Sequence, residues 1–367
     1  GRGGDITVHA SQSINISGKS KDAPSGLFAS TLSGGQGGNI TLYSPSFFLD
    51  QGGKIQSITQ GGDNAGHISI NVENFVLAGG GSISASTYSG NGNGGDIMIN
   101  AGNSVQISGY LGDYPSTIGS NSREGATGNA GKIIISAPQV ALSEFGSIQT
   151  ITETGGKGGN VTIKAGTLSV ASEATILAAT TGDGNAGSIN LNVDRLDLSS
   201  GGEVVASTLG KGQGGSIQVS ANESVTIKGE RDGFASGLYA RSKEMAFGDG
   251  GSINITAPQV LLDAGGQVSA GTSGSGRGGN VWFGTSNLTV TNGALVDTSS
   301  SGSGSGGDIR LNTTNLYLLN GGGIASRSIL TGDAGSVTVN AGDLRMFQGA
   351  LTTEAIVADG GNIDLHV

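Results

Sequence analysis

The chain has 367 residues, of which 71 are glycine, 35% are hydrophobic, 4% are aromatic and 13% are charged. A glycine excess of this size with only five prolines and no three-residue period excludes collagen, and it leaves disorder or a turn-rich repeat fold. The net charge of −10 disfavours nucleic-acid binding, which depends on Lys and Arg neutralising phosphates. No apolar run approaches the roughly 20 residues of a membrane span, and no cysteine is available for disulfides or thiolate metal sites.

A glycine-anchored repeat runs through the whole chain. Each anchor glycine follows Gly or Ala and precedes, by two residues, an Ile or Val; the spacing is 28 residues with occasional insertions. This regularity excludes disorder and predicts a solenoid. We expect each anchor to lie at a corner that either requires positive φ or has no room for a Cβ. The anchors are Gly4, Gly38, Gly66, Gly95, Gly131, Gly159, Gly187, Gly215, Gly251, Gly279, Gly307, Gly335 and Gly361.

Three short strands are predicted in each coil. In the coil that starts at Gly38, the first strand carries Ile40, the second carries Phe47 and the third carries Ile55, each in a period-2 apolar pattern typical of a half-buried strand. The pattern recurs from coil to coil and predicts an all-β fold, a right-handed parallel β-helix (β-solenoid) with about 28 residues and three short strands per coil and about 12–13 coils. We expect a single solenoid domain over residues 1–367.

Three coils are longer than the others, and they start at Gly4, Gly95 and Gly215. Their insertions concentrate aromatic and charged side chains, which is what glycan or protein recognition needs on one face of a solenoid. The alternative is that the insertions only cover apolar atoms at the corner. The candidate contact residues are Lys19, Lys21 and Asp22 in the first insertion, Tyr110, Asp113 and Tyr114 in the second, and Arg231, Asp232 and Phe234, followed by Tyr239, in the third.

Catalysis on a β-helix needs carboxylates at the same coil position in adjacent coils. The best acidic column directly follows the anchors, as at Asp5 and Asp96, but no two adjacent coils both carry an acid there, so we interpret it as turn capping. The group of Asp194, Arg195 and Asp197 lies in one coil without acidic neighbours and is interpreted as a solvated face. We therefore expect no catalytic residues and no enzymatic activity.

Metal and cofactor sites are not predicted either. His9, His67 and His366 are scattered over distant coils and form no cluster. Turns such as residues 182–185, GDGN, resemble calcium-binding nonapeptide repeats, but the period here is 28 residues and the same turn often carries serine. We expect no cofactor and no dedicated metal site, while weak calcium binding stays open.

Units such as residues 250–260, GGSINITAPQV, with residues 278–281, GGNV, one coil later, resemble filamentous-haemagglutinin-like exoproteins of the cyanobacterial type. The resemblance covers essentially the whole chain. It implies export by two-partner secretion through an outer-membrane transporter, folding outside the cell as a β-helical rod, and roles in adhesion, aggregation or extracellular fibres. The family's amino-terminal secretion domain is not evident, so we expect a fragment of the repeat region.

The sequence therefore predicts a secreted structural or adhesive rod, or a filament subunit, at a bacterial cell surface. Expected partners are copies of the chain stacked end to end, because coils that are open at both ends recruit further strands, and surface glycans or proteins. No nucleic-acid partner and no membrane span are expected. Two alternatives stay open: a carbohydrate-active β-helix of the lyase or hydrolase kind, and an inert stalk that presents a distal toxin or lectin domain.

Overall fold

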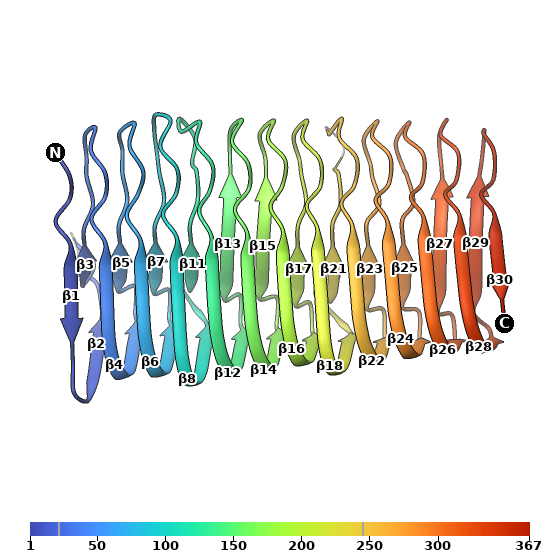
Figure 1. Cartoon of the computed structure of the whole chain (residues 1–367), viewed down its shortest axis with the longest axis horizontal. Helices are drawn as coiled ribbons and strands as arrows, with labels where there is room; N and C mark the ends of the chain where they lie inside the picture. Colours follow the sequence, from blue (N-terminus) through green and yellow to red (C-terminus); the bar gives the residue numbers. More distant parts are fainter. Residues whose placement is uncertain (21–22, 244–245) are drawn as a thin grey trace. The chain divides into compact units, whose positions relative to one another are not determined.

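The computed structural model describes residues 1–20, 23–243 and 246–367. Over these residues the protein is all-β, without helix, and its strands stack in parallel as a β-solenoid. The chain divides into two compact units, Gly1–Gly187 and Ser188–Val367. In each unit long strands lie side by side in one layer and short strands lie in a second layer behind them (Figure 1).

In unit 1 the long strands follow the order β1-β4-β6-β8-β12-β14, with β2 also paired to β4, and the short strands follow the order β3-β5-β7-β11-β13-β15. The long strands are β1 (Ile6–His9), β2 (Ser13–Ser17), β4 (Ile40–Asp50), β6 (Ile68–Ala78), β8 (Ile97–Ser108), β12 (Ile133–Ser143) and β14 (Val161–Ala171). The short strands are β3 (Gly26–Phe28), β5 (Lys54–Gln56), β7 (Ser82–Ser84), β11 (Thr117–Gly119), β13 (Ser147–Thr152) and β15 (Thr175–Thr180), and a small hairpin consists of β9 (Tyr110–Leu111) and β10 (Tyr114–Pro115).

Unit 2 repeats this arrangement, with the orders β16-β18-β22-β24-β26-β28-β30 and β17-β21-β23-β25-β27-β29. The long strands are β16 (Ile189–Ser199), β18 (Ile217–Lys228), β22 (Ile253–Asp263), β24 (Val281–Val290), β26 (Ile309–Leu319), β28 (Val337–Phe347) and β30 (Ile363–His366). The short strands are β17 (Glu203–Val205), β21 (Gly237–Tyr239), β23 (Gln267–Ser269), β25 (Leu295–Asp297), β27 (Gly323–Ser328) and β29 (Ala350–Ala355), and the hairpin is β19 (Glu230–Arg231) with β20 (Phe234–Ala235).

The strand register confirms the predicted coil. In unit 1, Ile133 pairs with Val161, one repeat of 28 residues further on, and in unit 2, Ile253 pairs with Val281. Equivalent residues of successive coils therefore stack in columns, at the spacing of about 4.8 Å that separates neighbouring strands. The extra residue in β8 is absorbed by a bulge opposite Ser136 to Gln139 of β12, so the columns continue past the long coil.

The core consists of the apolar columns that the repeat predicts. Ile40 and Leu42 of β4 are fully buried, and so are Phe47 and Leu49, which shows that the inward-facing positions change phase between residues 42 and 47. The first two predicted strands are therefore the two arms of one continuous, bent strand. Ile55, on β5, is fully buried from the opposite layer.

The anchor glycines lie where successive coils touch. A Cβ on Gly66 would overlap the carbonyl oxygen of Gly38, the anchor one coil earlier, and the anchors have none of the positive φ values found among the described residues. Of the two expected reasons for glycine, the structure supports the lack of space. Ser57 closes this corner, because its Oγ donates to Gly38 O at 2.6 Å and accepts from Gly66 N at 2.9 Å.

A second corner, between the long and the short strand, does require left-handed backbone. Gln51 and Gly52 have φ of 46° and 78°, and Asn320 and Gly321 have φ of 48° and 79°. Two successive residues in this conformation reverse the chain tightly, and Asn and Gly tolerate it best. The repeat pattern did not predict this corner.

The column that follows the anchors caps the turns, as its composition indicated. Asn39 Oδ1 accepts from the backbone N of His67 at 2.9 Å, His67 Nδ1 accepts from Asp96 N at 3.0 Å, and Asp96 Oδ1 accepts from Lys132 N at 2.9 Å. Each side chain thus satisfies the backbone donor of its equivalent one coil later, which links the coils along this edge.

Candidate functional site

The second predicted insertion forms the hairpin of β9 and β10 in unit 1. Tyr114 pairs with Leu111, and Ser116 fixes the base of the hairpin by donating to Ser108 O at 2.7 Å and accepting from Gly80 N at 3.1 Å. The Leu111 side chain lies over Gly80, where a Cβ would contact it at 2.7 Å. The Leu111 side chain therefore packs the hairpin against the preceding coil, where Gly80 has no side chain to prevent the contact.

The first insertion meets this hairpin. Lys19 and Pro24 form an antiparallel bridge, and the Lys19 ammonium lies 5.9 Å from the centroid of the Tyr114 ring. Lys21 and Asp22, which were predicted with them, lie outside the described residues. The structure thus brings Lys19 and Tyr114 together, although 95 positions separate them in the sequence.

A cleft of about 570 Å³ lies between the two insertions and the short strands. Its described lining contains Lys19, Lys54 and Arg123 and no carboxylate; Arg123 pairs at 2.8 Å with Glu153, outside the lining. Tyr114 lines the cleft and is 70% exposed. The cleft is a positively charged surface with an aromatic ring, on a chain that is acidic as a whole.

Two of the predicted contact residues in unit 1 lie away from this cleft. Tyr110 packs edge-to-face against Phe145, with ring centroids 5.6 Å apart, and Asp113 lies exposed in the hairpin turn. Tyr110 therefore supports the alternative that an insertion covers apolar surface, whereas Lys19 and Tyr114 face the cleft.

The third insertion forms the matching hairpin of unit 2. Arg231 pairs with Phe234 across the hairpin, Asp232 lies in its turn, and Phe234 is 57% exposed. Tyr239 is only 6% exposed, and its hydroxyl donates to Ala235 O at 2.8 Å. Phe234 is thus available for contact, while Tyr239 supports the base of the hairpin.

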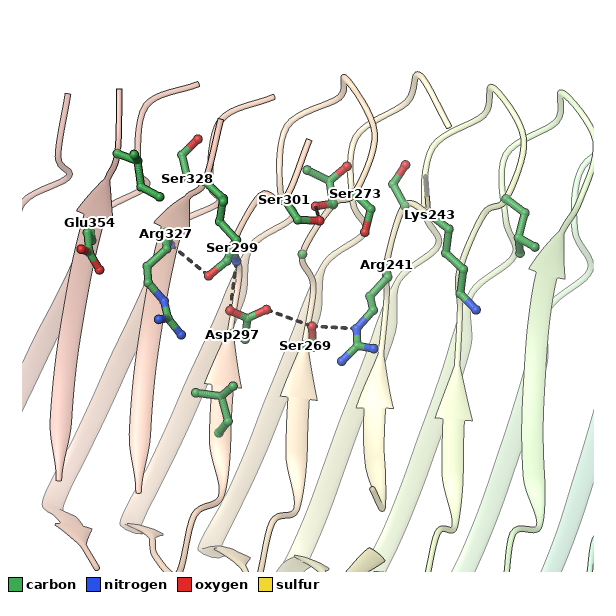
Figure 2. Close-up of a pocket in the computed structure, with 17 residues that line it drawn as sticks. Arg241, Lys243, Ser269, Ser273, Asp297, Ser299, Ser301, Arg327, Ser328 and Glu354 are labelled. Carbon is green, nitrogen blue, oxygen red and sulfur yellow. Dashed lines mark hydrogen bonds between the residues drawn. The ribbon is translucent and has the colours of Figure 1, made fainter. Parts of the chain in front are cut away.

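A larger depression of about 840 Å³, which the sequence did not predict, lies on the outer face of the short strands of unit 2 (Figure 2). We call it the trough. Its position follows from the register, because Tyr239 pairs with Ser269, Ser269 with Asp297 and Asp297 with Ala325. Two residues further on, the same register forms a column of Arg241, Gly271, Ser299, Arg327 and Glu354, and the next outward column contains Lys243, Ser273, Ser301, Ile329 and Ile356.

The Arg241 side chain is held in the trough by three contacts. Its guanidinium lies 4.2 Å from the centroid of the Tyr239 ring, its Nε donates to Ser269 Oγ at 2.8 Å and its Nη2 donates to Gln267 Oε1 at 3.1 Å. Ser269 Oγ in turn donates to Asp297 Oδ2 at 3.3 Å (Figure 2). A cation, a hydroxyl and a carboxylate are therefore connected across three successive coils.

The charges around the trough influence two titratable groups. Burial raises the pKa of the Glu203 carboxyl, and the positive charges of Arg241 and Lys243 oppose that shift. Burial also raises the pKa of the Tyr239 hydroxyl, which Arg241 opposes and Glu203 reinforces. Both shifts arise mainly from desolvation, so this part of the surface is partly shielded from water.

The group of Asp194, Arg195 and Asp197, interpreted from the sequence as a solvated face, lies at the surface of unit 2. Asp194 accepts from Asn222 Nδ2 at 2.7 Å, and Arg195 pairs with Glu223. His9 stacks on Tyr43 with ring centroids 4.6 Å apart. Among the described residues, no group of three His, Cys, Asp or Glu side chains is arranged to hold a metal ion, and no helix is long and apolar enough to cross a membrane.

Together these features define a parallel β-solenoid with a positively charged, hairpin-covered cleft in one unit and a mixed-charge trough in the other. Comparison with known protein families, curated proteins and solved structures finds no match to this chain.

Proposed function

We propose that this chain is part of a secreted structural and adhesive protein on a bacterial surface, of the filamentous-haemagglutinin-like kind, and that it acts by contact rather than by catalysis. The observation that carries the proposal is the convergence of Lys19 and Tyr114 on the cleft of unit 1. Two insertions from different coils place a cation and a largely exposed ring beside the same surface, as a contact site requires. Export through an outer-membrane transporter and end-to-end association of copies belong to the same proposal.

Adhesion is tested with beads coated with the purified chain and applied to bacterial cells and to immobilised cell-surface glycans. We expect wild-type beads to be retained, and Tyr114→Ala beads to be retained several-fold less, because an exposed aromatic contact is lost. Tyr88→Ala, at another partly exposed tyrosine of unit 1 outside the cleft lining, is the matched control. Equal retention of uncoated and coated beads, or equal losses in both variants, would contradict the proposal.

Surface exposure is tested separately, with antibodies against the chain on cells that express the full reading frame. We expect labelling of intact cells that disappears after brief external proteolysis. Labelling that requires permeabilisation would place the protein inside the cell and would overturn the proposed location.

A carbohydrate-active enzyme is the second candidate, because the trough combines the carboxylates of Asp297 and Glu354 with cationic side chains. Incubation with a polysaccharide panel separates the two functions. Release of reducing or unsaturated sugars that is abolished in Asp297→Asn would favour the enzyme, whereas binding without release would favour the adhesive role.

A further inference from the structure

We infer that the trough of unit 2 binds a linear acidic oligosaccharide of the uronate type, with sugar carboxylates on Arg241 and Arg327 and sugar hydroxyls on Asp297 and the serines between them. This inference rests on the proposed surface role and deepens it, because it assigns a ligand class to a particular site.

The trough has the dimensions and direction of a glycan chain. Arg241 and Arg327 occupy the same column three coils apart, which corresponds to about 14 Å at the strand spacing of a sheet. A pyranose ring in an extended glycan advances by close to one coil spacing, so successive sugars would lie over successive coils. The ligand would therefore run across the short strands, from one arginine to the other.

Small side chains form the floor between these ends. Gly271 and Ser299 lie between Arg241 and Arg327 in their column, and Ser273 and Ser301 lie beside them in the next column (Figure 2). Because the small residues Gly271 and Ser299 lie between two arginines, the surface is recessed over the two coils that carry these small residues. The floor presents hydroxyl groups, which can both donate to and accept from sugar hydroxyls.

Arg241 is already fixed in position before a ligand arrives. The Tyr239 ring, Ser269 and Gln267 hold its guanidinium, and these hydrogen bonds use two of its five N–H donors. The remaining donors suit a carboxylate, which arginine binds in a planar, two-bond arrangement. A side chain that is already ordered loses little conformational entropy when it binds.

The charge of the trough favours an acidic ligand. Its lining has the three cations Arg241, Lys243 and Arg327 and the two carboxylates Asp297 and Glu354, and the Glu203 carboxyl, outside the lining, interacts with Arg241 and Lys243. Neither Lys243 nor Arg327 has an ion-pair partner among the described residues, although the chain as a whole carries an excess of negative charge. A densely charged polyanion such as a nucleic acid would be repelled by Asp297 at the centre, whereas a uronate chain can place a hydroxyl there.

Titration calorimetry tests this inference on the full chain, with hexamers of galacturonate and of mannuronate as acidic probes and a galactose hexamer as the neutral counterpart. We expect at least one acidic hexamer to bind, and the neutral hexamer to bind at least about tenfold more weakly, because charge-assisted hydrogen bonds to arginine are lost.

Two charge-matched variants locate the site. Arg327→Gln removes a trough cation whose side chain has no ion-pair partner among the described residues, and we expect it to weaken acidic-hexamer binding about tenfold. Arg310→Gln removes the same charge from an exposed position on β26, in the other layer of unit 2, and should leave binding unchanged. Circular dichroism of both variants verifies that the fold is retained.

Three results would overturn the inference: no binding of either acidic hexamer, equal binding of the neutral hexamer, or an equal loss of affinity in both variants. The bead assay separates this failure from failure of the proposed function. If the beads adhere through Tyr114 but the chain binds no uronate hexamer, the ligand assignment is wrong and the adhesive role stands.

Discussion

At the scale of single residues, contact between successive corners determines where glycine is required. Gly66 lies against the Gly38 carbonyl, and Ser57 satisfies both backbone groups of that corner. Gly155 lies in a turn of the same unit, where a Cβ would meet no atom within 4 Å. These two glycines therefore differ in packing, although both belong to Gly-rich turns.

Gly66→Ala should destabilise the protein by about 1–3 kcal/mol, since the new methyl group must displace backbone in a closely packed column. Gly155→Ala should change the free energy of unfolding by less than about 0.5 kcal/mol. Denaturant unfolding followed by circular dichroism measures both values. Similar values for the two variants would show that the corner is not closely packed.

Glu203 makes stability depend on pH. Its pKa is raised on folding, so its contribution to stability is fully present below the pKa of the unfolded chain and is lost as the pH rises through the folded pKa. Glu203→Gln removes this partly buried charge. We expect the variant to melt at a higher temperature than the parent at neutral pH, and the difference to shrink as the pH falls towards 4.5. A difference that stays constant over this range would contradict the shift.

At the scale of elements, the hairpin of β9 and β10 depends on the coil beneath it. Gly80 has a φ of 75° and lies under Leu111, whereas Gly265, at the equivalent corner of another coil, has a φ of 81° and open space around it. Both positions have left-handed backbone, and of the two only Gly80 has a hairpin above it.

Gly80→Ala should therefore destabilise the protein by more than the strain of a left-handed alanine alone. We expect Gly265→Ala to be destabilising by about 1 kcal/mol, and Gly80→Ala to be more so and to displace the hairpin. Limited proteolysis should then show new cleavage within residues 110–115 only in Gly80→Ala. Equal cleavage in both variants would mean that the hairpin is not held by this contact.

The elements also show what the sequence could predict. Inward positions such as Ile40 and Ile55 were predictable, because alternation and a fixed period need no knowledge of three-dimensional contacts. The union of two predicted strands into β4 was not, because the phase change between residues 42 and 47 can mean either a break or a bend. The meeting of Lys19 with Tyr114 depends on the direction in which a hairpin folds, which its composition does not specify.

At the scale of the whole molecule, stacking in register makes coils interchangeable. Deletion of residues 131–158 would join Ala130 to Gly159 and would present Asn160 N to Asp96 in place of Lys132 N. We expect this chain to retain a β-rich circular dichroism spectrum and a cooperative melt. Deletion of residues 131–144, half a coil, should abolish the cooperative melt because it removes β12, which pairs with both β8 and β14 in the long-strand layer. Equal behaviour of the two deletions would contradict stacking by coil.

The same register explains why the trough escaped prediction. Its two arginines, Arg241 and Arg327, are 86 positions apart, and aligning them requires the two extra residues between Arg241 and Gly271 to be subtracted from the count. This column is not acidic; it places the small residues Gly271 and Ser299 between the two arginines. Hollows on a solenoid arise from such differences in side-chain size between neighbouring coils.

The hydrogen bonds between coils have a mechanical consequence. Within either unit they point along the direction in which coils are added, so tension along that direction loads every coil edge at once and opens the weakest edge first. Each coil that peels away would release about 95 Å of extended chain, at up to about 3.4 Å per residue. A protein of this kind would lengthen in steps under load and dissipate work at each step. A contact site at its end would then experience a smaller peak force during a sudden pull than a contact site on a rigid tether.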